Sequence, residues 1–535
     1  MHASHSSGRV AVVGAGPGGL AAAVLLAGRG LDVTIYERQP VIGGRTSRIQ
    51  QDGFSFDLGP TFFLMPHVLD EIFSAVGRRL ADYVDLRRLD PMYRLVIGQP
   101  GGQDITIDAT QDVEQMRQRL GSVHGPDGAA FGRFIADNRR KLDRMEPILR
   151  RPIRSPLDLV RPDAVRALSS LKLGQSVDDL NGRYFEHPAV RLAVGFQSKY
   201  LGMSPYECPS LFTILPFIEY EYGVWHPIGG CSALMRALAD VLVELGGRIE
   251  TDTPVERLRF DGDRIAGVEL GGRRDGAFEP CDQLVINADA TWAIKKFFPE
   301  SMRRGDTDAG LDGKRYSCST YMLYLGVDGA VDLPHHTIRT APDYRGNLED
   351  IGRAGGAGGS LSEDPSFYIC NPSPIDPSLA PPGASSLYIL VPTPNTRAPI
   401  DWQAERDAMR HRILGRISEV LGVDLAGRIR TEHSVTPADW AAMNINHGAT
   451  FNLAHSLDQM LHRRPQHKLP YVRNGWLVGG GTHPGSGLPV IFLSAQITAG
   501  MMLRSQSPPA PRRRLRPAAP GPASRREPAP VGAMS

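Results

Sequence analysis

A strand, a glycine-rich turn, a helix and a second strand follow one another near the N-terminus, and this pattern constrains the fold most. The apolar run 10–13 leads into Gly14, Gly16 and Gly19, and a second apolar run ends at Glu37. The first glycine makes the tight turn, the second lets the backbone approach a pyrophosphate, and the third lets the helix pack against its strand. The helix N-terminus adds free N–H groups and the positive end of its dipole. The pattern therefore predicts a parallel βαβ unit with a dinucleotide at its turn.

The acid after the second strand and the loop behind it narrow the choice of dinucleotide. Glu37 is placed to accept hydrogen bonds from an unphosphorylated ribose, which favours FAD or NAD. Gly43 and Gly44 permit a backbone turn close to a ligand, and Arg45 sets a fixed positive charge near a phosphate. From these two loops we expect cofactor contacts by Gly14, Gly16, Pro17, Gly18, Gly19, Glu37, Arg38, Gly43, Gly44, Arg45 and Thr46.

A second strand, turn and helix pattern lies near the other end of the chain. Residues 476–478 are apolar, 479–487 are rich in glycine, and 488–503 carry small and apolar residues at helical spacing. A helix N-terminus after such a turn offers backbone donors to a phosphate or to a flat ring. Since the two patterns are far apart, we expect one nucleotide domain built from distant segments.

Three motifs together resemble one family: the glycine-arginine loop at 43–46, the Asp-Leu-Gly-Pro-Thr turn at 57–61 and the Gly-Thr-His-Pro-Gly string at 481–485. This is the family of bacterial-type phytoene desaturases and their relatives, the carotenoid desaturases, isomerases and oxidases, within the FAD-dependent amine oxidase-like superfamily. The resemblance runs from about residue 10 to about residue 503 and implies FAD as the cofactor. It implies further FAD contacts by Gly59, Pro60, Thr61, Val255, Asn287, Ala288, Gly480, Gly481, Thr482, His483, Pro484, Gly485, Val490 and Ile491.

The resemblance also implies a reaction. Family members remove hydrogens across a carbon–carbon single bond of an acyclic C30 or C40 isoprenoid, such as phytoene or dehydrosqualene, which extends its conjugated polyene. The implied partners are this isoprenoid, a membrane lipid surface that delivers it, and an electron acceptor, either a quinone or oxygen. No residue stands out as the proton acceptor, and the catalytic candidates Glu219, Glu221, His226 and His483 stay open.

Other functions stay open beside desaturation. A carotenoid cis–trans isomerase or another flavin oxidase, such as an amine or protoporphyrinogen oxidase, shares the N-terminal motifs. A protein that only carries isoprenoids is disfavoured, because a flavin held from both sides implies redox use. Gly479 to Gly481 replace the Gly-Ala-Gly that is typical of phytoene desaturases, which leaves the exact substrate open.

The expected fold class is α/β. A Rossmann-like FAD-binding domain is expected from the discontinuous segments 9–110, 224–300 and 470–505. Residues 111–223 are expected to form a helical substrate and membrane-contacting subdomain, and 301–469 an inserted mixed-sheet substrate-binding domain. The proline- and arginine-rich tail 507–535 has almost no large apolar residue and is expected to be disordered.

Composition agrees with a globular enzyme. Hydrophobic residues make up 41% of the 535 positions and the formal net charge is +2, so no nucleic-acid partner is indicated. The five cysteines show no CxxC spacing, which indicates neither a metal site nor a disulfide framework. No apolar run approaches the roughly 18 residues that span a bilayer, and no secretory signal precedes the first strand. A cytoplasmic protein, peripherally attached to the membrane, is the expectation.

The expected membrane contact is the segment 139–172. Ten basic residues and only four acidic ones alternate there with large apolar side chains. Basic heads over an apolar underside are what an interfacial helix uses on anionic lipid. A solvated helix face over an ordinary core explains the same pattern equally well. The resemblance favours the membrane, because the implied polyene is insoluble in water.

Overall fold

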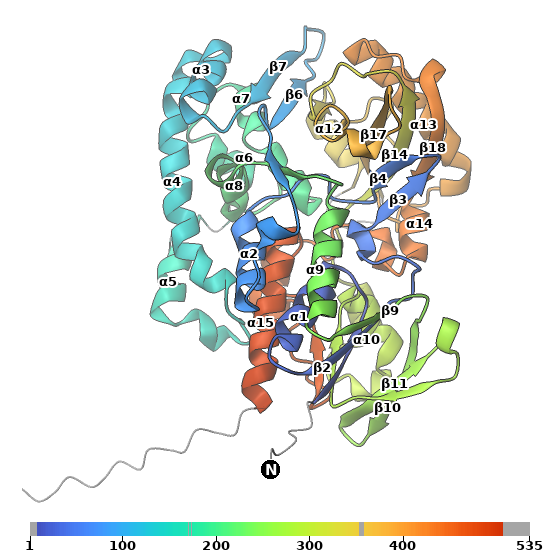
Figure 1. Cartoon of the computed structure of the whole chain (residues 1–535). Helices are drawn as coiled ribbons and strands as arrows, with labels where there is room; N and C mark the ends of the chain where they lie inside the picture. Colours follow the sequence, from blue (N-terminus) through green and yellow to red (C-terminus); the bar gives the residue numbers. More distant parts are fainter. Residues whose placement is uncertain (1–7, 170, 173, 353–357, 507–535) are drawn as a thin grey trace, which may run out of the picture.

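The computed structural model describes residues 8–169, 171–172, 174–352 and 358–506 (Figure 1). The tail 507–535, for which the sequence predicts disorder, lies outside the described residues. A five-stranded parallel sheet has the strand order β19, β13, β1, β2, β9. Its strands are β1 (Arg9–Val13), β2 (Asp32–Tyr36), β9 (Arg248–Glu250), β13 (Gln283–Ile286) and β19 (Gly475–Leu477). The parallel βαβ unit is thus present, and strands from distant parts of the chain complete its sheet.

Alternating side chains of β1 explain why both faces of this sheet are covered. Val10 and Val12 are buried against one layer, which consists of α1 (Pro17–Ala27), α2 (Pro66–Ala75), α9 (Ser232–Glu244) and α15 (Leu488–Gln506). Ala11 and Val13 share a core with the other layer, which contains β10 (Val255–Asp261), β11 (Arg264–Leu270) and α10 (Ala290–Phe297). Strand β12 (Phe278–Pro280) pairs with β11 at the edge of this layer. Successive side chains of a strand point to opposite faces, so a doubly covered strand needs an unbroken apolar run.

Helix α15 packs beside α1 and α2 in the helical layer (Figure 1). Its segment Leu488–Ser505 is long and apolar enough to cross a membrane by length and composition, and 56% of it is buried inside the protein. The expectation that no apolar run approaches roughly 18 residues is therefore wrong for this helix. The long apolar run is explained by the position of α15. A helix that covers a sheet and contacts two other helices is apolar over most of its surface.

A seven-stranded mixed sheet forms the other half of the molecule, with the order β18, β14, β17, β16, β15, β6, β7. Its strands are β6 (Tyr93–Ile97), β7 (Ile105–Ala109), β14 (Ser319–Asp328), β15 (His336–Thr340), β16 (Phe367–Cys370), β17 (Ala384–Thr393) and β18 (Ile429–Val435). Neighbouring strands are antiparallel except β6 and β15, which are parallel. Because β6 and β7 belong to this sheet, the range 9–110 contributes to both sheets rather than to the cofactor half alone.

The remaining elements surround these two sheets. The region 111–223 folds mainly as helices, and α4 runs along the outside of the molecule (Figure 1). Its helices are α3 (Val113–Val123), α4 (Gly125–Leu149), α5 (Pro162–Ser169), α6 (Val177–Asn181), α7 (Pro188–Ala193) and α8 (Ile214–Tyr222). The others are α11 (Asp308–Asp312), α12 (Tyr344–Asp350), α13 (Trp402–Leu421) and α14 (Pro437–Ala442), with the strand pairs β3 (Arg48–Gln51) and β4 (Phe54–Asp57), and β5 (Leu86–Arg88) and β8 (Trp225–Pro227).

The basic segment 139–172 divides into a buried and an exposed part. Ordinary packing explains many of its apolar side chains, since the core takes Leu142, Met145, Ile148 and Ile153. Leu157, Val160 and Val165 are instead exposed, by 76%, 69% and 51%. The apolar surface of this segment is therefore confined to the chain around α5.

Candidate functional site

A cavity of about 930 Å³ is lined by residues from both halves of the molecule. One part of its wall comes from the ends of β1 and β2, at Val13 and Tyr36, where a βαβ unit binds its ligand. Another part comes from the seven-stranded sheet, at Met322, Ile338 and Leu390. The cavity therefore joins the predicted dinucleotide site to an apolar chamber.

The turn after β1 has no room for side chains at two of its glycines. Gly14 has a φ of +92°, and a Cβ there would lie 2.4 Å from the carbonyl oxygen of Asn287. A Cβ on Gly19 would lie 2.2 Å from the carbonyl oxygen of Gly14. Asn287 also donates from Nδ2 to the Gly14 carbonyl at 3.2 Å, so this asparagine fixes the turn. Glycine at these two positions therefore lets the turn pack closely against Asn287 and against the start of its own helix.

Two backbone amides hold the Glu37 carboxylate beside the turn. Its Oε2 accepts from the Ala15 N–H and its Oε1 from the Gln39 N–H, both at 2.8 Å. The side chain is 5% exposed and lines the cavity. Each carboxylate oxygen has a second lone pair, so Glu37 can still accept hydrogen bonds from ribose hydroxyls.

Arg45 places a positive charge in the same wall. Its Nη1 donates to the carbonyl oxygen of Thr450 at 2.5 Å. Burial lowers the pKa of the guanidinium, and Asp289 acts in the opposite direction. A guanidinium nevertheless stays charged in proteins. With Gly44 and Thr46 it lines the cavity, which suits a diphosphate.

Arg464 holds the C-terminal glycine loop from behind. It is 2% exposed, and it donates to the carbonyl oxygens of Gly480 at 2.9 Å and of Thr482 and Leu453 at 3.2 Å. Burial lowers its pKa to about 10. Three backbone carbonyls thus accept from Nε and Nη2 of one buried guanidinium and fix the path of the loop.

The expected cofactor contacts fall into two groups. Those that line the cavity are Gly14, Gly16, Pro17, Glu37, Arg38, Gly44, Arg45, Thr46, Gly59, Pro60, Val255, Asn287, Ala288, Gly480, Val490 and Ile491. Those outside its lining are Gly18, Gly19, Gly43, Thr61, Gly481, Thr482, His483, Pro484 and Gly485. Members of the second group support the loops, as Thr482 does by donating from Oγ1 to the Gly479 carbonyl at 2.8 Å. Their direct contact with a cofactor stays a prediction.

Glu219, one of the catalytic candidates, lies directly behind the cavity wall on α8. It is 0% exposed, and its carboxylate accepts from Tyr200 at 2.7 Å, Tyr93 at 3.0 Å and Gln197 at 3.1 Å. Burial raises the pKa of Glu219 to about 7, although the three donors act in the opposite direction. Tyr93 and Tyr200 line the cavity. The phenols of Tyr93 and Tyr200 therefore connect the apolar chamber directly to the Glu219 carboxyl, whose pKa is near neutrality.

The other three candidates are outside the residues that line the cavity. Glu221 forms an ion pair with Arg139. His226 lies 3.0 Å from Asp376, measured from Nε2 to Oδ2. His483 Nε2 lies 3.1 Å from the Ile148 carbonyl oxygen, and burial lowers the pKa of His483 to about 4. Their partners give all three a structural explanation.

An aromatic group around Phe62 was missed in the sequence. Its ring centroid lies 5.3 Å from that of Tyr200 and 5.4 Å from that of His336, and all three rings line the cavity. His336, His335 and Cys370 bring potential metal-ligand atoms within 4.8 Å of one another. The pairing of β15 with β16 brings these atoms together, since His336 stands opposite Cys370 in the sheet register. Cysteine spacing along the chain cannot reveal such a pair.

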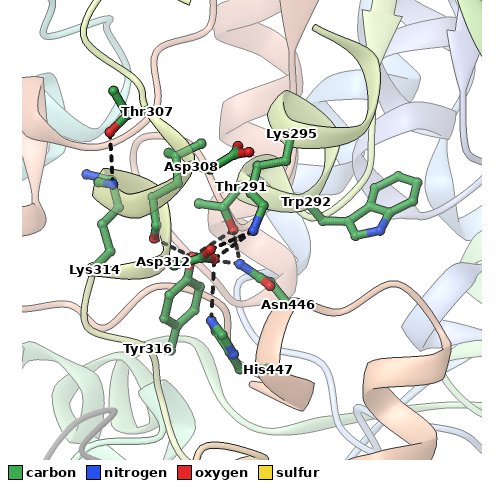
Figure 2. Close-up of polar contacts among 12 residues, drawn as sticks. Thr291, Trp292, Lys295, Thr307, Asp308, Asp312, Lys314, Tyr316, Asn446 and His447 are labelled. Atoms are coloured by element: carbon green, nitrogen blue, oxygen red, sulfur yellow. Dashed lines mark hydrogen bonds and ion pairs between the residues drawn. The ribbon is translucent and has the colours of Figure 1, made fainter. Parts of the chain in front are cut away.

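A polar network joins α10, in the cofactor half, to loops of the other half. In Figure 2, Thr291, Tyr316 and Asn446 point toward one another. Asn446 Nδ2 donates to Tyr316 at 2.8 Å and to Thr291 at 3.0 Å, while Lys295 donates to Asp312 at 2.8 Å. Because Asp289 and Trp292 line the cavity on α10, the network fixes this wall against the opposite domain.

These features together fit FAD. Gly14 and Gly16 at the turn, the Glu37 carboxylate and the Arg45 guanidinium line one cavity, which is the donor and acceptor set that a pyrophosphate and a ribose require. The C-terminal loop places Gly480, Val490 and Ile491 in the same wall, as a second surface for a flat ring.

Comparisons with known proteins agree with this geometry. The family model described as flavin containing amine oxidoreductase matches residues 17–503. The chain is similar to a 4,4'-diapophytoene desaturase (4,4'-diapolycopene-forming) of Methylomonas sp, with 41% identity over 92% of this chain and 94% of that relative. It is also similar to a zeta-carotene-forming phytoene desaturase of Myxococcus xanthus, with 36% identity over 94% and 95%. Among solved structures, an oxidoreductase from Methanosarcina mazei has a TM-score of 0.60 at 16% identity, over 93% of this chain and 100% of that chain, which shows a shared fold.

Proposed function

The chain belongs to the flavin containing amine oxidoreductase family, and from this premise we propose that it desaturates a long acyclic isoprenoid of C30 or C40 length. Its cofactor is FAD. The observation that carries the proposal is the continuity of one cavity from the nucleotide turn to the apolar chamber between the sheets. A chamber with aromatic and aliphatic walls suits a hydrocarbon chain. The desaturase relatives support the same substrate class.

The protein contributes binding, orientation and exclusion of water. FAD, when bound, supplies the redox chemistry by taking a hydride from the substrate. The turn at Gly14 and the carboxylate of Glu37 would hold the nucleotide end, and Arg45 would supply positive charge to its phosphates. Phe62 and the apolar wall hold the polyene in one orientation, so that its reacting carbons stay in place.

Glu219 is our proposed proton acceptor. Removal of a hydride and a proton from adjacent carbons forms the new double bond. The Tyr200 hydroxyl takes that proton as its own proton passes to Oε1 of Glu219, 2.7 Å away. The phenol is unchanged after the step, and the carboxylate ends protonated. An acid with a pKa close to the working pH suits such a transfer.

Expression in hosts that supply a C30 or a C40 precursor tests the proposed reaction. A desaturase lowers the product mass by two hydrogens for each double bond, and the absorbance of the extracted lipids moves to longer wavelength. An unchanged mass with altered absorbance would indicate a cis–trans isomerase instead. Reoxidation of the reduced enzyme by a quinone or by oxygen, compared in the same extracts, identifies the acceptor.

Replacing Glu37 by alanine is expected to weaken FAD retention. The change removes the carboxylate that faces the ribose and releases the Ala15 and Gln39 amides. A hydrogen bond to a charged group contributes about 1.5–3 kcal/mol, which corresponds to a roughly tenfold to hundredfold rise in the FAD dissociation constant. Flavin fluorescence after dilution measures the release. Glu37→Gln is the control, since it keeps one acceptor, and equal retention in all three proteins would contradict the assignment.

A membrane contact completes the proposal. We propose that the protein is cytoplasmic and attaches to lipid through a docking patch, which consists of Leu157, Val160 and Val165 with Arg154 and Arg161 beside them. Such a patch combines apolar burial with attraction to anionic headgroups. Leu149 and Leu159 are half-buried and pack against the core, so the structure assigns the apolar surface to fewer residues than the whole segment 139–172.

The double variant Leu157→Glu and Val160→Glu is expected to bind anionic liposomes about tenfold or more weakly. Both side chains are exposed, so the fold stays intact, while the apolar burial on the lipid is lost. Sedimentation with liposomes measures the effect, and FAD content checks the fold. Val243→Glu, which changes an exposed apolar residue on α9, is the matched control.

Deleting 507–535 should leave binding intact at physiological salt, because salt screens a contact that depends on charge alone. Release by that deletion would assign the contact to the tail.

A further inference from the structure

A lysine in the cavity wall has no hydrogen-bond or ion-pair partner among the described residues. Lys199, on a 3₁₀ helix that spans Phe196–Leu201, lines the cavity. Its ammonium makes no hydrogen bond or ion pair with any residue in the described part of the chain. Burial lowers the pKa of Lys199, because an ammonium is poorly solvated there.

Two further donors share this part of the wall. Cys318, just before β14, is close enough for the ammonium to act on its thiol, and Tyr344, at the start of α12, packs in one cluster with Cys318. Both residues line the cavity. Burial holds the pKa of Tyr344 well above its usual range, so the hydroxyl stays protonated, and it too has no hydrogen-bond partner among the described residues. Lys199 and Tyr344 thus both line the cavity, each lies near Cys318, and each carries a donor that no described residue uses.

Two other cations, Lys141 and Arg339, have acceptors within the fold. Lys141, 9% exposed, donates to the Thr213 hydroxyl at 2.5 Å, to Asn138 at 3.1 Å and to the Ser210 carbonyl at 3.4 Å. Arg339 in the cavity wall is paired with Asp364. A buried charge without partners is costly. Lys199 differs from Lys141 and Arg339, because no described residue accepts a hydrogen bond from its ammonium.

A pure hydrocarbon cannot satisfy these donors. We propose that Lys199 and Tyr344 form a polar subsite that binds a carbonyl oxygen of a ligand in the cavity. The oxygen accepts one hydrogen bond from the ammonium and one from the phenol. Two ligands of the proposed desaturase supply that chemistry, namely an isoprenoid oxidised at its end and a quinone electron acceptor. The choice of these two ligands rests on the proposed function. The two donors themselves do not depend on it.

Binding of two probes to the FAD-loaded protein tests the subsite without turnover. The probes are an acyclic C30 polyene aldehyde and duroquinone, and the acyclic C30 hydrocarbon polyene is the reference. We expect wild-type protein to shift the aldehyde absorbance to longer wavelength, because an ammonium polarises the carbonyl. Lys199→Met should abolish the shift and weaken binding of at least one carbonyl probe about tenfold to hundredfold, with hydrocarbon binding unchanged. Tyr344→Phe should give a smaller loss, and Lys172→Met, on the exposed surface, none.

Each outcome decides the proposal. Weaker aldehyde binding alone assigns the subsite to an oxidised isoprenoid end, and weaker duroquinone binding alone assigns it to the electron acceptor. Equal binding of both carbonyl probes by Lys199→Met would overturn the subsite. Loss of FAD by Lys199→Met would also overturn it, since the ammonium would then belong to the cofactor site. If wild-type protein binds the carbonyl probes but does not desaturate the hydrocarbon, the proposed function fails and the subsite stands.

Discussion

The variant Gly485→Val is expected to retain FAD and to lose desaturation. Gly485 has a φ of +146°, which β-branched residues avoid, and its Cβ would lie 2.4 Å from Nε2 of the buried His455. Backbone strain of this kind costs about 1–3 kcal/mol before the clash is counted. The loop would have to shift, and with it Ser486 and Gly487, which line the cavity. Product formation and the flavin spectrum, measured on the same preparation, report the two effects separately.

Gly415→Val is the matched control for this substitution. Gly415 is an exposed position on α13, and a Cβ there meets nothing within 4 Å. In a helix, valine costs no more than glycine, so stability and activity should stay close to wild type. A fully active Gly485→Val enzyme with an unchanged flavin spectrum would contradict the placement of this loop beside the reaction.

Replacing Glu219 by glutamine is expected to slow turnover strongly and to remove its pH dependence near neutrality. In wild type, only the ionised carboxylate accepts a proton, so turnover should rise with pH through about 7. The groups that face Glu219 are the phenols of Tyr93, Tyr200 and Tyr220 and the amide of Gln197. Burial raises the pKa of each phenol, so none of them titrates in this range. A pH–rate profile with the same inflection in Glu219→Gln would assign it to another group.

The same variant has a stability signature that does not depend on catalysis. The folded pKa of Glu219, about 7, lies above its ordinary value of 4.5, so the folded state binds the proton more tightly. Its contribution is complete below about pH 4.5 and is lost as the pH rises to about 7, with a total of about 3 kcal/mol. Glutamine does not titrate, and it keeps one of the two acceptor oxygens. The melting temperature of Glu219→Gln relative to wild type should therefore rise between pH 5 and pH 8.

Local geometry made the nucleotide turn predictable from the sequence. A Cβ at Gly14 or Gly19 would lie within 2.4 Å of a backbone oxygen, so only glycine fits at these positions. The glycines therefore occur at a fixed spacing that can be recognised in the sequence. The discontinuous α/β architecture followed from the motifs at the two ends, and the FAD family is confirmed by the match over 17–503. Motifs of this kind act within a few residues, which is why a single sequence shows them.

Contacts between distant segments were not visible in the same way. The pairing of β6 with β15 moves an N-terminal hairpin into the second sheet, and no local pattern marks it. The sequence does not distinguish Glu219 from the other three catalytic candidates. Its distinguishing feature is the hydrogen bonds from Tyr93 and Tyr200, which belong to two other elements. Lys199 carries no motif, and only the cavity around it distinguishes it from a surface lysine.

The order of strands in the five-stranded sheet has a consequence for how the chain is made. The central strand β1 pairs with β2 on one side and with β13 on the other, and β19 then pairs with β13. At ordinary ribosome speeds, β19 leaves the ribosome roughly 20–90 s after β1. During that interval the nascent chain exposes the unpaired edge of β13 and lacks Gly480, Val490 and Ile491, so the cavity is complete only after nearly the whole described chain has been synthesised. We therefore expect the yield of active protein to depend on protection of this strand edge during translation.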